Sequence, residues 1–317
     1  MRHALAGWAC VTLSVLCARA QTPTRPHVVF VTGDCEYRSE ITMPMISEIL
    51  QKHHGMRCTV CTARDDRGEL RPKYLRNIVG LEALRQADLA VFFIRYRQLP
   101  DVQLRSILDY AASGKPLVGL RTTTHAFRYT AGPHMRWNDG FGLDIFGQKW
   151  IRHHGHDSST RVYLAVKDHP IARGLAPEFH CRSWLYHVMP LSGDCHPLLL
   201  GAAVKGDKPD GAMFGTPNPV AWTKTYGRAR VFFTTLGHPQ DFEVESVRRL
   251  LVNGIYWALG LEQKIPPEGT KVDYVTPYVA PPTTRAVPDP TLPRSATVTY
   301  VPEEEGYPGG ASSGLRR

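Results

Sequence analysis

Four segments contain histidines whose side chains could transfer protons or bind ligands. They occupy residues 119–127, 153–156, 168–170 and 236–242. His125 and His238 each come directly after a strand-like apolar run, at 115–120 and at 230–236. The carboxyl ends of parallel strands meet at one edge of an open α/β sheet, and such sheets build their sites there. We therefore expect His125 and His238 to lie over one active or binding site.

His125, His238 and Asp241 are the candidate catalytic residues. An imidazole exchanges protons near neutral pH, which suits general acid-base chemistry. Asp241 follows His238 closely enough to orient its ring, as carboxylates often do for reactive histidines. The structural alternatives are that Asp241 stabilises a turn and that His125 packs beneath Phe127. We favour a catalytic role for both histidines, with Asp241 as the orienting carboxylate.

Three more histidines, His153, His154 and His156, share one short segment. Adjacent rings can present one side chain to a substrate and the other to solvent. Imidazole also binds zinc and other divalent transition metals, so His153, His154 and His238 are the candidate ligands of a metal. No His-Glu-x-x-His motif or Cys/His ladder accompanies them. Substrate binding by His153 and His154 is therefore our first expectation, and a bound metal stays an alternative.

Further side chains near these segments could bind a substrate through carboxylate, hydroxyl, guanidinium or ring groups. They are Asp34, Tyr37, Arg121, Thr123, Trp184 and Tyr186. Each has a structural alternative: Asp34 could cap the helix that follows it, the aromatic pair could pack against the domain, and Arg121 could pair with an acid. The turn 168–170 reads as structural because its proline restricts the backbone.

Alternating strand and helix segments must position these residues. Runs of strand length lie at 27–32, 58–62, 88–94, 116–120, 219–222 and 230–234. Helical segments are expected at 42–53, 81–86, 102–112 and 244–259. This alternation predicts an α/β fold with a doubly wound, mostly parallel sheet covered on both faces. The middle, 127–215, has short strand candidates at 161–166 and 197–202, and otherwise reads as loops over the site.

The two ends of the chain differ from the middle. An arginine at position 2, an apolar stretch over 4–16 and the small-residue sequence 18–20 are typical of a secretory signal peptide. We therefore expect residues 1–20 to be removed and the protein to be exported, to the periplasm or outside the cell. Residues 21–264 then form one domain. Residues 265–317 are rich in Pro, Thr and Gly, so we expect a disordered or surface-draped tail.

Charge and cysteine content exclude some classes of protein. The net charge is +9, but its basic residues form no block and no aromatic-basic motif, so no nucleic-acid partner is expected. No later apolar run approaches the roughly 20 residues of a membrane helix, so no membrane insertion is expected. The odd cysteine set after residue 20 argues against a complete disulfide framework. Cys181 and Cys195 could still form a disulfide, while Cys58 and Cys61 read as core residues.

Several segments together resemble the ThuA-like family of trehalose-utilisation proteins. The carrying residues are Gly119–Phe127, His153-His154-Gly155, Asp168–Ile171 with Gly174-Leu175, Pro219–Trp222, Arg230–Pro239 with Asp241-Phe242, and Arg249–Trp257. The likeness covers about residues 27 to 260. It implies an α/β fold of the class I glutamine-amidotransferase-like, or flavodoxin-like, type.

This chain also departs from the pattern of that superfamily. Members that act as amidotransferases or peptidases have a nucleophilic Cys or Ser at the turn after the strand that precedes the helix. At the equivalent turn this chain has Thr122, Thr123 and Thr124. Many relatives have an acidic residue or His where Trp184 stands. The resemblance therefore implies a sheet that has lost the nucleophile, and glutamine-dependent amide transfer is not expected.

Taken together, these residues predict an exported ThuA-like protein of carbohydrate metabolism. The expected ligand is a small-molecule carbohydrate, a disaccharide or its keto derivative. Acid-base chemistry by His125 and His238 would serve hydrolysis, elimination or isomerisation. Two alternatives stay open: a non-catalytic carbohydrate-binding or scaffolding module, and a metal-dependent hydrolase that uses a divalent metal such as zinc.

Overall fold

The computed structural model describes residues 25–284. Within this range ten strands form one sheet in the order β3-β2-β1-β4-β5-β12-β11-β10-β7-β8. In chain order they are β1 (His27–Gly33), β2 (Arg57–Ala63), β3 (Ile78–Val79), β4 (Leu89–Ile94), β5 (Leu117–Leu120), β7 (Ser158–Leu164), β8 (Glu178–Cys181), β10 (His196–Lys205), β11 (Met213–Tyr226) and β12 (Ala229–Thr234). The predicted signal peptide lies outside the described residues.

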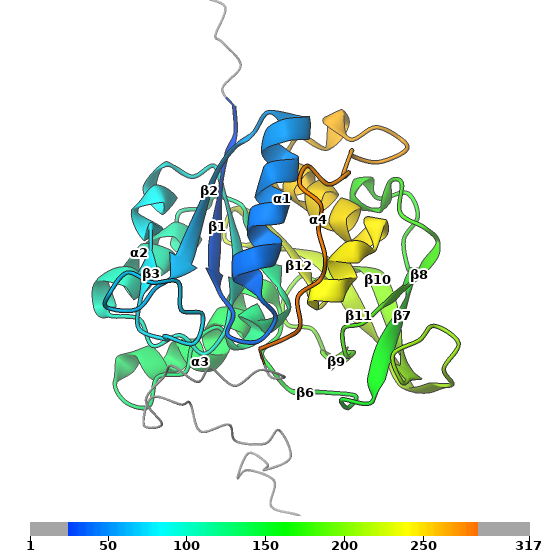
Figure 1. The fold of residues 1–317 in the computed structure, drawn as a ribbon, viewed down its shortest axis with the longest axis horizontal. Coiled ribbons are helices and arrows are strands. Elements are labelled where there is room, and N and C mark those ends of the chain that lie inside the picture. The colour runs from blue at the N-terminus through cyan, green and yellow to red at the C-terminus, as the bar shows by residue number, and fades with distance from the viewer. Residues whose placement is uncertain (1–24, 285–317) are drawn as a thin grey trace, which may run out of the picture.

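Helices cover both faces of the sheet (Figure 1). The α-helices are α1 (Ser39–His54), α2 (Asp101–Ala112), α3 (Arg136–Gly140) and α4 (Glu245–Ala258). Residues of α1 and α4 pack in the core on one face, and residues of α2 pack in the core on the other. The predicted helix at 81–86 is a 3₁₀ helix, Leu81–Gln86. The predicted doubly wound α/β architecture is confirmed.

The first strand shows why the sequence folds this way. All seven residues of β1 are buried, as the near-continuous apolar run predicts for an interior parallel strand. Val28 and Phe30 point into the core on the α1 face, while Val29 and Val31 point into the core on the α2 face. This alternation follows from the two-residue period of a strand. Strands β2, β1, β4, β5 and β12 are mutually parallel.

The middle of the chain was predicted mostly as loops with two strand candidates, and it contains more strands than that. Residues of β7, β8, β10 and β11 extend the same sheet by antiparallel pairing beyond β12. Only β7 and β10 overlap the strand candidates at 161–166 and 197–202. The predicted strand at 219–222 lies within β11, but the first part of β11 was missed because Gly215 and Pro217 weaken a strand pattern. A separate two-stranded sheet pairs β6 (Arg152–His153) with β9 (Tyr186–His187).

The cysteines are all free thiols in the part of the chain that the structure describes. A disulfide between Cys181 and Cys195 was considered, and the fold contradicts it. Cys181 belongs to the core on the α1 face of the sheet, and Cys195 packs against the core on the opposite face. Cys58 and Cys61 also contact opposite cores, as expected from the strand period.

Within residues 25–284 no helix has the length and apolar character needed to cross a membrane. Residues 265–284 run in extended form beside α1 and α4, and the rest of the predicted tail lies outside the described residues (Figure 1).

Candidate functional site

The loops that follow β1, β4, β5 and β12 gather at the carboxyl edge of the parallel strands. They carry Tyr37, Arg95, Arg121 and His238, which are linked through contacts with one another or with shared neighbours. The segment between β5 and β7 and the segment around β9 add further rings to this group. We call the following residues the ring cluster: Tyr37, Tyr96, Arg121, His125, Trp150, His153, Trp184, Tyr186 and His238.

Arg121 is at the centre of the ring cluster and occupies a strained backbone position. It comes directly after β5 and has a φ of 40°, in the left-handed region that non-glycine residues rarely adopt. α/β-Hydrolases place their nucleophile on a sharp, strained turn of this kind between a strand and a helix. From the sequence we expected Thr122–Thr124 to occupy this turn, but the residue with the strained backbone conformation is Arg121. Its guanidinium cannot act as the missing nucleophile.

The Arg121 guanidinium is enclosed by aromatic rings. It lies 4.2 Å from the centre of the Tyr37 ring, 4.6 Å from that of Tyr186 and 5.9 Å from that of Trp184. It donates hydrogen bonds to the Thr235 carbonyl at 3.0 Å, to the Trp184 carbonyl at 3.5 Å and to the Tyr37 hydroxyl at 3.0 Å. Arg121 therefore holds several loops of the site together, which was not the role predicted for it.

Asp241 fixes the backbone of the His238 loop. Its fully buried carboxylate accepts hydrogen bonds from the N–H groups of Gly237, His238 and Ser183, and from the Ser183 hydroxyl. No bond joins Asp241 to the His238 ring among the contacts of the described residues. The predicted orienting role is therefore corrected: Asp241 positions the main chain of the loop, because its oxygens are used by four donors.

The His238 ring is oriented by a different group. The Gln240 N–H donates to Nδ1 of His238 at 3.2 Å, so in the neutral ring the proton lies on Nε2. Burial lowers the pKa of His238 to about 4, helped by the positive charges of Arg121 and Arg182 and opposed by Asp241. At neutral pH His238 is therefore an uncharged ring that presents an Nε2–H donor. Its ring centre lies 6.0 Å from that of Tyr37.

His125 is bonded at both ring nitrogens. Arg95 Nε–H donates to Nε2 at 3.2 Å, and this leaves Nδ1 as the donor to the Thr124 hydroxyl at 2.9 Å. Burial, together with the charges of Arg95 and Arg121, keeps the pKa of His125 well below its usual range. Arg95 is itself held by the Glu36 carboxylate at 2.8 Å. Neither nitrogen of His125 is left for a substrate unless one of these bonds opens.

A continuous series of ring contacts connects the two histidine loops. Trp150 lies 5.0 Å from His125 and 5.9 Å from His153, measured between ring centres. His153 lies 5.0 Å from Trp184, which in turn lies 6.2 Å from Tyr37 beside His238. Tyr186 contacts Trp150 at 4.6 Å. The structure therefore brings the predicted residues Tyr37, Arg121, His125, His153, Trp184, Tyr186 and His238 into one cluster.

Three residues that were predicted to bind substrate do not belong to the ring cluster. Asp34 is fully buried and caps its own loop by accepting the Glu36 and Tyr37 N–H groups; burial raises the pKa of Asp34 to about 7. Thr123 is fully buried and donates to the Phe92 carbonyl. His154 stacks on His187 at 3.9 Å and donates to the Leu185 carbonyl. These contacts give all three a structural role in the fold.

The candidate metal ligands do not converge. Within residues 25–284 no three His, Cys, Asp or Glu side chains gather in a way that could hold a metal ion. His154 stacks on His187, His238 faces Tyr37, and His153 lies between Trp150 and Trp184. The residues present therefore do not fit a zinc site, and no chemistry is assigned to a metal.

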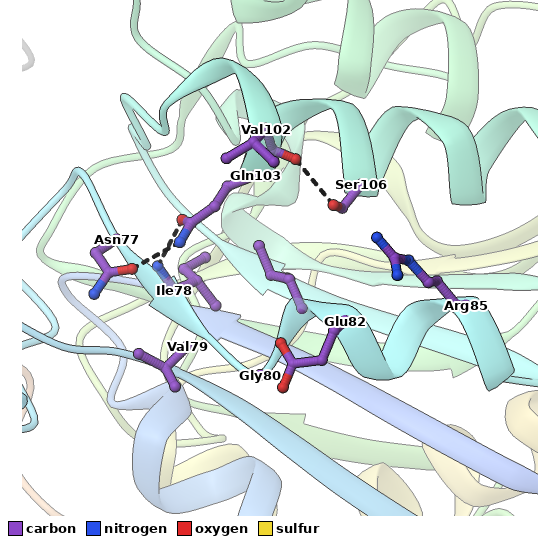
Figure 2. A pocket seen from close by; sticks show the side chains of 10 residues that line it. Asn77, Ile78, Val79, Gly80, Glu82, Arg85, Val102, Gln103 and Ser106 are labelled. Carbon is purple, nitrogen blue, oxygen red and sulfur yellow. Dashed lines mark hydrogen bonds between the residues drawn. The ribbon is translucent and has the colours of Figure 1, made fainter.

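A separate hollow of about 340 Å³ lies beside α2, away from the predicted site residues (Figure 2). Within it Gln103 donates to Asn77 at 2.7 Å and accepts from the Ile78 N–H at 3.0 Å, and the side chains of Glu82 and Arg85 also line it. No site residue predicted from the sequence lines this hollow.

Several residues of the site were missed in the sequence. Arg95 and Glu36 form a buried ion pair beside His125, and Trp150 and Tyr96 pack on its ring. Arg95 and Tyr96 directly follow β4, so the rule that was applied to His125 and His238 would also have found them. Trp150 comes from an irregular segment and gives no comparable signal.

Comparison with known proteins agrees with this architecture. The family model named ThuA, described as trehalose utilisation, matches residues 27–258. No curated protein matches the chain in sequence. A putative ThuA-like protein from Parabacteroides merdae has 19% identity and a TM-score of 0.53, covering 79% of this chain and 96% of that one. Another from Bacteroides uniformis has 15% identity and a TM-score of 0.52, covering 75% and 94%.

At these identities the two structures show the fold alone, which is the flavodoxin-like α/β fold described above. The family model is the stronger finding, because it covers most of the chain and includes both histidine loops. This protein therefore belongs to the ThuA family, which is related to trehalose utilisation.

Proposed function

We propose that the ring cluster binds a carbohydrate, and that the ligand is a disaccharide or its keto derivative. The observation that carries this proposal is the continuous group of aromatic and imidazole rings around Arg121, built from the loops after adjacent strands and from the segments around β6 and β9. Small-molecule sites combine apolar and aromatic walls with a few fixed polar groups, and this cluster has both. The family's relation to trehalose utilisation supports the choice of a sugar.

Two buried donors favour a ligand rich in oxygen atoms. Nε of Arg121 and Nε1 of Trp184 have no hydrogen-bond partner among the described residues. Buried polar groups in native proteins are nearly always paired, so each exception needs a physical reason. Sugar hydroxyl and carbonyl oxygens are acceptors that could satisfy such donors after a small movement of the Trp184 ring.

His238 is the residue best placed for chemistry. It is half-buried, its tautomer is fixed by Gln240, and its Nε2–H can donate to a carbonyl or glycosidic oxygen. A neutral imidazole in this state stabilises negative charge that develops on oxygen. His125 stays a predicted acid-base partner, but it would first have to release Arg95 or Thr124.

The test is a mass-spectrometric assay of the purified protein with trehalose, other disaccharides and their keto derivatives. The proposal predicts turnover of at least one sugar and a loss of about 100- to 1000-fold in kcat/KM for His238→Ala, because an oxygen-stabilising donor is removed. The matched control is His196→Ala, which removes an exposed histidine that pairs with Asp194 on the surface. Equal rates for both variants would contradict the role of His238.

A second candidate function is a non-catalytic carbohydrate-binding module. Arg121 at the strained turn after β5 favours it, since a guanidinium supplies no nucleophile, and so do the two bonds that occupy both ring nitrogens of His125. This alternative predicts sugar binding without turnover. Binding by the wild type, measured by calorimetry, together with no product in the assay would select it.

We also propose that the protein is exported, on the basis of the signal-like residues 1–20. The test is N-terminal sequencing of protein secreted or released from the periplasm of an expression host. A mature N-terminus at Gln21 is expected. Protein that keeps Met1 and stays in the cytoplasm would contradict export.

A further inference from the structure

Residues 265–284 form an extended segment, here called the strap, which connects α4 to the edge of the ring cluster. In Figure 1 it is the orange chain that passes beside α1 and α4. The strap lies beyond residues 27–258, the part of the chain that the family model matches. The family model therefore does not include the contacts of the strap.

The first half of the strap is anchored to the helices. Ile265, Thr270 and Val272 are almost completely buried. Asn253 of α4 accepts hydrogen bonds from both the N–H and the hydroxyl of Thr270, and Arg248 of α4 donates to the Val272 carbonyl at 2.9 Å. These contacts fix the first half of the strap against α4.

The second half of the strap contacts the loop that carries His238. The Tyr278 hydroxyl donates to the Pro239 carbonyl at 2.9 Å, immediately after His238. The Tyr274 hydroxyl donates to the Phe242 carbonyl at 2.8 Å, and the Ala280 N–H donates to the Glu243 carboxylate at 3.1 Å. The whole 3₁₀ turn Pro239–Glu243 is therefore tied to the strap.

The end of the strap contacts the loop after β1. The Thr284 N–H donates to the Glu36 carbonyl at 2.9 Å, and its hydroxyl donates to the Cys35 carbonyl. The strap therefore contacts both the His238 loop and the loop after β1. The latter carries Glu36, which pairs with Arg95, the residue that donates to His125.

We propose that the strap positions the His238 loop relative to the loop after β1, whose Glu36 pairs with Arg95 beside His125, with Tyr278 and Thr284 as positioning residues. Tyr278 bonds the His238 loop and Thr284 bonds the loop after β1, so together the two residues link both loops, whereas Tyr274 and Ala280 add bonds to the His238 side only. Neither residue belongs to the ring cluster. The effect on sugar affinity rests on the proposed function, but the effect on loop order does not.

The experiment measures amide hydrogen exchange in the ligand-free, full-length protein. The variants are Tyr278→Phe, Thr284→Val and the double variant, each of which removes hydroxyl groups with little change of shape. The reporters are the N–H groups of Tyr37 and His238, which are protected by Asp34 and Asp241. Each single variant should speed exchange in its own loop by about tenfold, the size expected for one hydrogen bond.

Two controls make the result specific. Thr284→Ser keeps the hydroxyl and should restore protection in the loop after β1. Tyr226→Phe changes a half-buried tyrosine at the end of β11 and should leave both loops unchanged. Wild-type exchange rates in the strap variants would overturn the proposal. Faster exchange throughout the domain would also overturn it, because the strap would then be a general stabiliser.

A trehalose titration of the same variants separates this proposal from the proposed function. Weaker affinity in the double variant, with its melting temperature close to that of the wild type, supports positioning of the site. If wild-type protein binds neither trehalose nor its keto derivatives, the proposed function fails, while the exchange data still decide on the strap.

Discussion

His125 and His238 follow neighbouring strands and were predicted as equivalent partners, but their surroundings differ. His125 is buried, and both of its ring nitrogens are bonded, to Arg95 and to Thr124. His238 is half-buried, and only Nδ1 is bonded, to the Gln240 N–H. The difference shows that the neighbours of a histidine, and not its place after a strand, decide whether the ring can meet a substrate.

Position within the sheet explains the difference. Strand β5 lies between β4 and β12, so the loop after it is enclosed by the loops of both neighbours. Strand β12 lies where the parallel half of the sheet meets the antiparallel half. The His238 loop therefore has parallel neighbours on one side only, and its fixed shape comes from Asp241.

The largest expected effect tests the support of the His238 loop. Asp241→Asn places an amide N–H₂ group among four donors, so we expect the free energy of unfolding to fall by about 3 kcal/mol or more. Urea denaturation measures this change. Asp194→Asn is the control, since this surface carboxylate pairs only with exposed His196 and should contribute less than about 1 kcal/mol. Equal costs would contradict the role of Asp241.

Truncation of the two histidines compares them directly. We expect His125→Ala to reduce the free energy of unfolding by about 2–3 kcal/mol, because it opens a cavity and leaves Arg95 Nε–H unpaired. His238→Ala should cost about 1 kcal/mol or less, since it loses one long bond at a half-buried position. Chemical denaturation of both variants gives the values. Similar costs for the two variants would remove the distinction between them.

The pH dependence of stability tests the uncharged state of His238. Its pKa is about 4 in the folded protein and about 6.5 in the unfolded chain, so the unfolded state binds more protons between these values. Stability should therefore fall as the pH decreases below 6.5, by about 2 kcal/mol at pH 5, and this loss should be absent in His238→Asn. The raised pKa of Asp34 increases stability as the pH falls, but by the same amount in the wild type and in His238→Asn. Parallel curves for the two proteins would contradict the prediction.

The smallest expected effect concerns the second bond of His125. Thr124→Val removes the hydroxyl that accepts from Nδ1–H, and we expect a loss of about 1 kcal/mol with no change in the NMR signals of His238. Thermal unfolding and a histidine-detected NMR spectrum measure both. A change at His238 would show that the two loops are coupled through this bond.

The parallel half of the fold was predictable because its strands are buried on both faces. Runs such as 27–32 and 88–94 are near-continuously apolar, and a helix with apolar spacing follows each of them. The antiparallel half was predicted only in part. The runs at 161–166, 197–202 and 219–222 overlap β7, β10 and β11, whereas the first part of β11 was missed because it carries Gly215 and Pro217, and β8 because it has four residues. Residue order alone did not show that these segments join the same sheet.

Much of the candidate site was predictable, but its roles were not. The rule that loops follow parallel strands located Tyr37, Arg121, His125 and His238. Which group binds which depends on tertiary contacts: Asp241 is near His238 in sequence but bonds to backbone groups. The positive φ of Arg121 and the ion pair of Glu36 with Arg95 are likewise set by packing.

Sugar binding at the ring cluster is tested most directly by isothermal titration calorimetry of wild-type protein, His238→Ala and His196→Ala with trehalose and its keto derivatives. The proposed function predicts binding of at least one of these sugars by the wild type and by His196→Ala, and an affinity about tenfold lower or more for His238→Ala, the value of one well-formed hydrogen bond. Equal affinity in all three proteins, or no binding of any of these sugars by the wild type, would contradict it.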